Sequence, residues 1–177
     1  MGVSLIYFET ERLIARDYIA SDYLPFSQLN ADKEVMKYFP ALLTSKESNA
    51  LLDRNQKELT SLGYGLFAIE EKSTGEFIGF TGFHEATFEA EFTPCIEIGW
   101  RLKKTVWNQG YATEAALGAI AYANEHTSIE EIYSFTATLN KPSEQVMKKI
   151  ALTKIATFNH PALVNGDPLR PHVLYKA

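Results

Sequence analysis

Cysteine is almost absent from this sequence, and few kinds of thiol-based or metal-binding site are possible as a result. Cys95 is the one cysteine among 177 residues, which excludes an internal disulfide and a cysteine-based zinc cluster. The four histidines lack the spacing that is typical of metal ligands, and we predict no metal site. We interpret Cys95 as a small strand residue, because nothing in the sequence indicates a group that would activate its thiol.

Positive charge and long apolar runs are also scarce. The 17 Lys and Arg residues face 22 Asp and Glu residues, which gives a net charge of −5. An acidic chain is poorly suited to bind phosphate backbones, and no stretch reaches the roughly 20 apolar residues of a membrane helix. The first residues lack the basic and apolar parts of a secretion signal. We therefore expect a cytoplasmic protein that binds neither nucleic acid nor membrane.

Apolar residues are present in sufficient number for a folded core. They make up 46% of the chain, with 12% aromatic residues, so we expect one domain over residues 1–177. A capping box at Thr44 and Glu47, followed by a terminating Gly63, predicts a well-defined helix between them. The expected strands are 13–17, 64–70, 76–84, 94–102, 131–139, 154–158 and 172–176, and the expected helices start at Ser21 or span 32–39, 45–62, 110–125 and 140–150.

The order of these elements predicts a mixed α/β (α+β) domain. The strand–helix–strand unit at 94–139 implies one parallel strand pair inside a mostly antiparallel sheet, flanked by helices. Alternation along the strand 94–102 assigns its residues to two faces. Ile96, Ile98, Trp100 and Leu102 share one face, and Glu97, Gly99 and Arg101 share the other.

The segment from Arg101 to Ala115 is the strongest candidate for chemistry. It joins a strand to a helix rich in small residues, and unpaired N–H groups at a helix N-terminus favour a phosphate. Arg101, Lys103 and Lys104 are expected to add positive charge beside it. An ordinary strand–helix turn with a well-placed glycine explains the same residues, and the pattern alone does not separate the two interpretations.

A resemblance to a known family favours the phosphate interpretation. Trp107-Asn-Gln-Gly110-Tyr-Ala112 resembles the pyrophosphate loop of the GNAT superfamily of acyl-CoA-dependent N-acetyltransferases, whose pattern is Gln/Arg-x-x-Gly-x-Gly/Ala. Trp107 departs from the first position and is similar to the RimJ/RimL-like branch. Further segments resemble that branch in the same order, namely Thr10-Glu-Arg-Leu13, Gly79-Phe-Thr-Gly82, Glu97-Ile-Gly-Trp100 and Asn140-Lys-Pro-Ser143; Ala151-Leu152 departs from it.

The resemblance implies acetyl-CoA as co-substrate. In the GNAT fold two parallel strands splay apart, and the pantetheine arm lies in the gap between them. The splay here implies contacts from Ile98, Gly99 and Trp100, and a ligand amide can satisfy backbone groups left unpaired. The implied contacts to the rest of the cofactor come from Trp107, Asn108, Gln109, Gly110, Tyr111, Ala112, Thr113, Asn140 and Ser143.

The implied reaction is direct attack of a primary amine on the thioester, which needs a base, an oxyanion donor and a group at the leaving sulfur. A backbone N–H near Ile98 is the candidate oxyanion donor. Glu97 is the candidate base, or else it pairs with Arg101 or another cation. Ser143 is the candidate for the sulfur, or else it bonds its own helix turn. The position where many GNAT enzymes carry a tyrosine acid is Met147.

The acceptor is left open at this stage as a protein N-terminus or a small amine. Because the tyrosine is missing, an alternative is a catalytically silent module that binds or senses acyl-CoA on the same fold. Monomer and homodimer are both compatible with the sequence.

Overall fold

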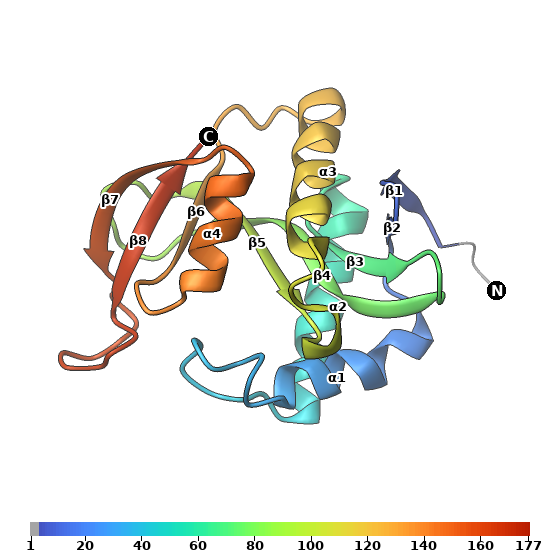
Figure 1. The fold of residues 1–177 in the computed structure, drawn as a ribbon, viewed down its shortest axis with the longest axis horizontal. Helices are drawn as coiled ribbons and strands as arrows, with labels where there is room; N and C mark the ends of the chain where they lie inside the picture. The colour runs from blue at the N-terminus through green and yellow to red at the C-terminus, as the bar shows by residue number, and fades with distance from the viewer. Residues whose placement is uncertain (1–3) are drawn as a thin grey trace.

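The structure is a computed structural model that describes residues 4–177 and contains one eight-stranded sheet (Figure 1). The strand order is β1-β2-β3-β4-β5-β6-β8-β7. Only β5 and β6 pair in parallel among these strands, which confirms the mixed sheet predicted from the sequence. The strands are β1 (Ile6–Glu9), β2 (Leu13–Arg16), β3 (Leu66–Glu71), β4 (Glu76–Ala86), β5 (Cys95–Leu102), β6 (Tyr133–Ala137), β7 (Thr153–Asn159) and β8 (Pro171–Lys176).

Four α-helices cover the two faces of the sheet. Helices α1 and α2 contact β3 and β4 on one face, while α3 and α4 lie beside each other on the opposite face (Figure 1). None of the helices in residues 4–177 is long and apolar enough to cross a membrane. The helices are α1 (Tyr23–Ala31), α2 (Ser45–Leu62), α3 (Tyr111–His126) and α4 (Lys141–Lys149), with short 3₁₀ turns at Ala20–Asp22 and Lys104–Val106.

Helix α2 begins and ends where its capping residues predict. The Thr44 hydroxyl accepts from the Glu47 N–H at 3.2 Å, and the Glu47 carboxylate accepts from the Thr44 N–H at 2.8 Å. Gly63 follows the last turn with φ +74°, and its N–H donates to the Leu59 carbonyl. A glycine adopts this left-handed conformation without steric cost.

Two local predictions need correction. The segment 32–39 is a series of turns and not a helix. The Asp32 carboxylate accepts from the N–H groups of Glu34 at 2.8 Å and Val35 at 3.3 Å, and a side-chain turn of this kind competes with helix formation. Strand β1 was not expected, because its four residues form an edge that only its pairing with β2 defines.

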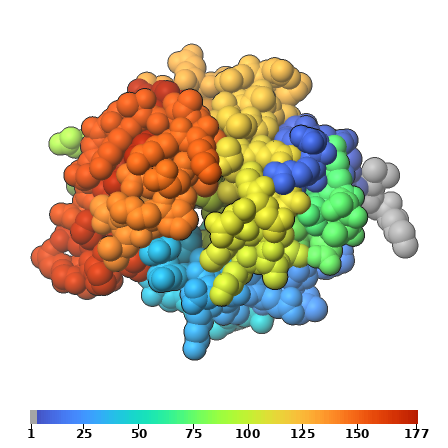
Figure 2. Space-filling model, viewed as in Figure 1, coloured from blue at the N-terminus to red at the C-terminus, as the bar shows by residue number. Residues whose placement is uncertain are grey.

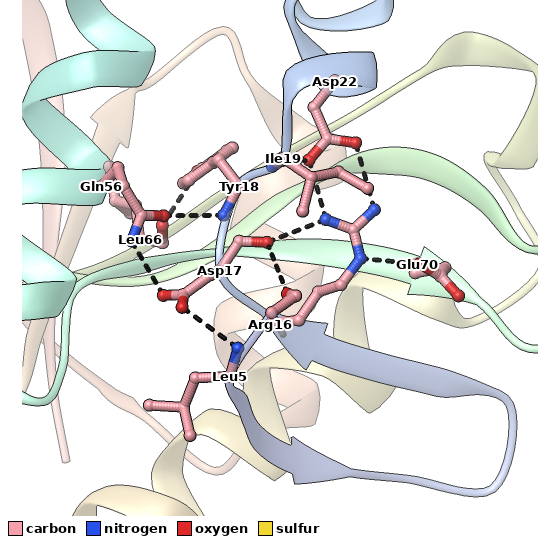
Figure 3. A network of polar contacts seen from close by, with 10 residues as sticks. Leu5, Arg16, Asp17, Tyr18, Ile19, Asp22, Gln56, Leu66 and Glu70 are labelled. Atoms are coloured by element: carbon pink, nitrogen blue, oxygen red, sulfur yellow. Dashed lines mark hydrogen bonds and ion pairs between the residues drawn. The ribbon is translucent and has the colours of Figure 1, made fainter. Parts of the chain in front are cut away.

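A buried arginine ties β2 to α1 and β3. Arg16 donates to both carboxylate oxygens of Asp22, at 2.7 and 3.1 Å, and to Glu70 at 2.6 Å (Figure 3). Asp17 next to it accepts from Gln56 of α2 at 2.9 Å. Charged groups in a protein interior need such partners, so this network fixes the end of the sheet against the first two helices.

The parallel pair β5–β6 is short. Glu97 and Tyr133 form its one residue pair, whereas β6 and β8 share five. The next ladder position is taken by a side chain, because the Ser134 hydroxyl donates to the Ile98 carbonyl at 2.9 Å. Beyond this point the two strands diverge (Figure 1), and the gap between them is the centre of the candidate site.

Candidate active site

The loop before α3 presents backbone N–H groups that lack protein partners. Gly110 is the N-cap of α3 with φ +82°, and no side chain caps the helix. Asn108 also has a positive φ of 59°. The N–H groups of Tyr111, Ala112 and Thr113 occupy the first helical turn, where no intrahelical acceptor exists. This arrangement of N–H groups and helix dipole suits a phosphate.

Arg12 stands beside this loop, and sequence reasoning assigned it no role there. Its guanidinium donates to the Gln109 carbonyl at 2.9 Å, lies 4.1 Å from the centre of the Tyr111 ring and pairs with Glu114 at 2.6 Å. Arg12 lies in the Thr10-Glu-Arg-Leu13 segment that resembles the family, about a hundred residues away in sequence. Only the family resemblance could have drawn attention to it, because no local pattern links residue 12 to the loop.

Two of the three cations that were expected beside the loop, Arg101 and Lys103, lie elsewhere, while Lys104 is exposed in the 3₁₀ turn directly before the loop. Arg101 turns to the opposite face of the sheet, where it donates to Asn30 at 2.7 Å. Lys103 pairs with Glu76 at the β4 end. The expectation failed for Arg101 because it used nearness along the chain. The alternation of β5 side chains already assigns Arg101 to the face of Glu97.

The mouth of the strand gap is held by a contact between β5 and α4. The Trp100 indole N–H donates to the Ser143 hydroxyl at 2.9 Å, which leaves the hydroxyl proton free to donate. Asn140 caps α4 by accepting from the Ser143 N–H at 3.3 Å, and its amide donates to Thr136 at 3.0 Å. Figure 2 shows a narrow hollow at this place, between the orange surface of the C-terminal half and the yellow loop before α3.

The backbone of β5 faces the gap on alternate residues. Since the Ile98 carbonyl points to β6, the backbone groups of Trp100 point the same way. The one residue pair between β5 and β6 lies at Glu97, and Trp100 lies beyond it. Trp100 is therefore the first β5 residue after this pair whose N–H and carbonyl face the gap. We expect the candidate oxyanion donor near Ile98 to be this N–H.

Glu97 lies on the opposite face, with His84 of β4 and Tyr133 of β6 as its cross-strand neighbours. Burial raises the pKa of its carboxyl to about 8. In the described part of the chain, no cation lies within ion-pair distance of Glu97. The alternative that it pairs with Arg101 is thereby removed. A carboxyl with this pKa can accept a proton near neutral pH.

Gly99 stands between Glu97 and Arg101 on the same face. A methyl group built on Gly99 would meet no atom within 4 Å, so the space above it is open. On the face of α3 and α4, Met147 is buried. Ser143 is therefore the α4 candidate that remains for the leaving sulfur.

The cysteine shows no sign of activation as a nucleophile. Burial raises the pKa of the Cys95 thiol to about 11, so it is protonated at neutral pH and a poor nucleophile. Across residues 4–177, no group of three or more His, Cys, Asp or Glu side chains is placed to hold a metal ion.

Comparison with known proteins identifies the family of this chain. The acetyltransferase (GNAT) domain family matches residues 12–153. The uncharacterized N-acetyltransferase YnaD of Bacillus subtilis is 27% identical over 154 residues, which cover 86% of each chain.

Two solved structures share the fold. The GNAT-family acetyltransferase of Bacillus anthracis has a TM-score of 0.79 at 24% identity and covers 96% of both chains. RimL, a ribosomal L7/L12 alpha-N-protein acetyltransferase in complex with coenzyme A, has a TM-score of 0.78 at 16% identity and covers 98% of this chain and 97% of its own.

Proposed function

The chain belongs to the GNAT family of acetyltransferases, and from that premise we propose that it transfers the acetyl group of acetyl-CoA to a primary amine in a ternary complex. The observation that carries the proposal is the combination of an uncapped α3 N-terminus with a strand gap that opens beside the Glu97 carboxyl, which has no ion-pair partner in residues 4–177. The proposed acceptor is either a protein N-terminus, as for RimJ/RimL-like enzymes, or a small amine.

The residues present fit acetyl-CoA as co-substrate. The N–H groups of Tyr111, Ala112 and Thr113 would bind the pyrophosphate, and Arg12 holds the loop carbonyl of Gln109 in place. The backbone of Trp100 faces the gap where the pantetheine arm would find amide partners. When bound, acetyl-CoA would supply the activated carbonyl and the acceptor would supply the amine, while the residues of the chain would position both and hold or move the protons.

Glu97 and Ser143 lie on opposite faces of the sheet, which gives them different tasks. Glu97 accepts a proton from the attacking amine on the α2 face. The Trp100 N–H donates to the oxyanion at the level of the strand gap. The Ser143 hydroxyl, oriented by the Trp100 indole, donates to the departing sulfur on the α4 face. Addition of the amine to the thioester carbonyl gives a tetrahedral oxyanion, and its collapse reforms the carbonyl and expels the CoA thiolate toward Ser143.

A thiol-release assay tests the proposal. The purified protein is mixed with acetyl-CoA and a panel of N-terminal peptides, polyamines, amino acids and amino sugars, and free CoA thiol is measured. We expect acceptor-dependent release, with the acetylated amine identified by mass spectrometry. Tight CoA binding without turnover of any amine would instead support a silent acyl-CoA-binding module, which the buried Met147 at the usual tyrosine position keeps open.

A further inference from the structure

Arg101 has a guanidinium nitrogen that the contacts within residues 4–177 leave unpaired. Its Nε is buried and has no hydrogen-bond partner, one of three such side-chain atoms in residues 4–177. One guanidinium nitrogen donates to Asn30 at 2.7 Å, and the group lies 4.2 Å from the centre of the Phe39 ring. No carboxylate in the described chain lies within ion-pair distance of it.

Arg16 shows how this fold treats a buried arginine that serves the structure. Its Nη1 and Nη2 atoms donate to the Asp22 carboxylate, and its Nε donates to the Glu70 carboxylate (Figure 3). Arg101 instead donates to one neutral acceptor, the amide oxygen of Asn30 in the last turn of α1. An unpaired buried charge is costly, and burial lowers the pKa of Arg101 to about 10, which still leaves it charged at neutral pH.

The neighbours of Arg101 hold it in position for an anion. Asn30 is completely buried and donates to the Ser48 hydroxyl at 2.9 Å, so its oxygen is fixed toward Arg101. Phe39 covers one side of the guanidinium while 39% of its own surface remains exposed. Phe80 lies 5.1 Å from the guanidinium as well, and residue 101 as a whole is of intermediate exposure. The guanidinium is therefore held in one position in a residue that is not fully buried.

The position of Arg101 relates it to the reaction centre. Glu97, Gly99 and Arg101 follow one another on one face of β5, and Gly99 is open to the space between them. Strand residues rise about 3.3 Å each, so Gly99 and Arg101 are about 7 Å apart along the strand. An acceptor whose amine lies over Gly99 and whose second group lies about that far along the strand would bring this group to Arg101.

We propose that Arg101 binds a carboxylate of the acceptor, so that the preferred acceptor is a primary amine that carries a carboxylate several bonds away. The guanidinium recognises the carboxylate through charge-assisted hydrogen bonds, while Glu97 receives the amine at the other end. This inference rests on the proposed acetyl transfer and adds the chemical class of the acceptor to it.

A matched pair of acceptors tests the inference. δ-Aminovalerate and its neutral amide differ only in the carboxylate, and kcat/KM is measured for both. We expect the wild type to prefer the acid by about 10- to 100-fold, the range for one charged hydrogen-bonded contact. In Arg101→Met this ratio should fall to about one. A wild type that turns over both equally, or an Arg101→Met variant that keeps the preference, would overturn the inference.

Two further variants separate recognition from folding. Asn30→Asp places a carboxylate on Arg101 in a side chain of the same shape, and it should remove the preference for the acid without the loss of any arginine. Arg54→Met removes an exposed arginine of α2 and should keep the preference. If Asn30→Asp kept it as well, Arg101 would not be the anion site.

Product binding distinguishes failure of this inference from failure of the proposed function. Calorimetry compares N-acetyl-δ-aminovalerate with its amide on the CoA-loaded protein, which needs no turnover. Tighter binding of the acid to wild type than to Arg101→Met, without turnover of any amine, would retain the anion site and reject acetyl transfer. Equal binding of acid and amide, or no binding of the acid, would reject the anion site whatever the enzyme does.

Discussion

Glu97 and Arg101 are an acidic and a basic residue on one face of β5, and neither lies within ion-pair distance of an oppositely charged side chain in residues 4–177. Burial brings the pKa of Glu97 up to about 8 and that of Arg101 down to about 10. Such groups reduce stability, and proteins keep them mostly at functional sites. The role of Glu97 can therefore be tested in two independent ways, by the free energy of unfolding and by the rate of the reaction.

The stability of Glu97→Gln should exceed that of wild type increasingly as pH rises. The folded pKa of Glu97 is raised, so the native state binds more protons than the unfolded state between about pH 4.5 and 8. Wild-type stability therefore falls with pH in this window, by at most about 1.4 kcal/mol per pH unit. Glutamine cannot titrate and removes this contribution. Denaturant unfolding at pH 5 and pH 8 measures it, and an equal difference at both pH values would show that Glu97 is not protonated in the native state.

The rate should respond to the same ionisation. If Glu97 is the base, kcat/KM of wild type divided by that of Glu97→Gln rises with pH up to about 8 and stays constant above it. The acceptor amine titrates identically in both proteins and cancels from the ratio. Initial rates from pH 6 to pH 9.5 measure it. A ratio that does not change with pH would remove Glu97 from proton transfer.

Ser143 gives a third prediction at this scale. Ser143→Ala removes the hydroxyl that would face the leaving sulfur, and kcat should fall by about 10- to 100-fold. Trp100→Phe removes the indole N–H that orients Ser143 but leaves the hydroxyl, so its kcat should fall less. Steady-state kinetics of both variants decide the matter. Equal losses would mean that the Trp100–Ser143 bond, and not the hydroxyl proton, is what the reaction needs.

Helices and strands were predictable from the sequence where capping residues or apolar alternation agreed with the tertiary packing. Helix α2 follows from Thr44, Glu47 and Gly63, and the strand alternation of β5 from its own residues. The segment 32–39 was misjudged because the Asp32 side chain stabilises a turn. Strand β1 was not predicted, and within the sheet its pairing with β2 alone defines it. The family resemblance predicted the loop before α3 as the phosphate site, and the contact of Arg12 with the Gln109 carbonyl links positions about a hundred residues apart.

The N-terminus of α3 is tested by a pair of glycines with the same backbone. Gly110 and Gly63 have φ values of +82° and +74°, and both are exposed. Gly110 precedes α3, and Gly63 follows α2. Glutamate at either position incurs the same left-handed strain, about 1 kcal/mol. Gly110→Glu also places negative charge beside the first-turn N–H groups and should abolish CoA binding. Gly63→Glu should retain it. Calorimetric titration with CoA compares them, and retained affinity in Gly110→Glu would show that the phosphates bind elsewhere.

At the scale of the whole molecule, a net charge of −5 conceals a division between the two faces of one sheet. The face of α3 and α4 offers backbone donors and the Ser143 hydroxyl, which suit the cofactor. The face of α1 and α2 offers Glu97 and Arg101, which suit an acceptor with both charges. Because the cofactor and the acceptor would bind on different faces, CoA binding to the face of α3 and α4 should be measurable before any acceptor is known.

CoA should therefore stabilise the whole fold. A ligand that binds only the native state at 100 times its Kd adds about 2.7 kcal/mol, which for a chain of this size raises Tm by roughly 5 to 11 °C. Differential scanning fluorimetry with increasing CoA measures the shift, and Gly110→Glu serves as the control that should show none. A shift in wild type without turnover of any amine would favour the silent acyl-CoA-binding module over the enzyme. The absence of a shift at millimolar CoA would reject both, because each requires the uncapped α3 N-terminus to bind the cofactor's phosphates.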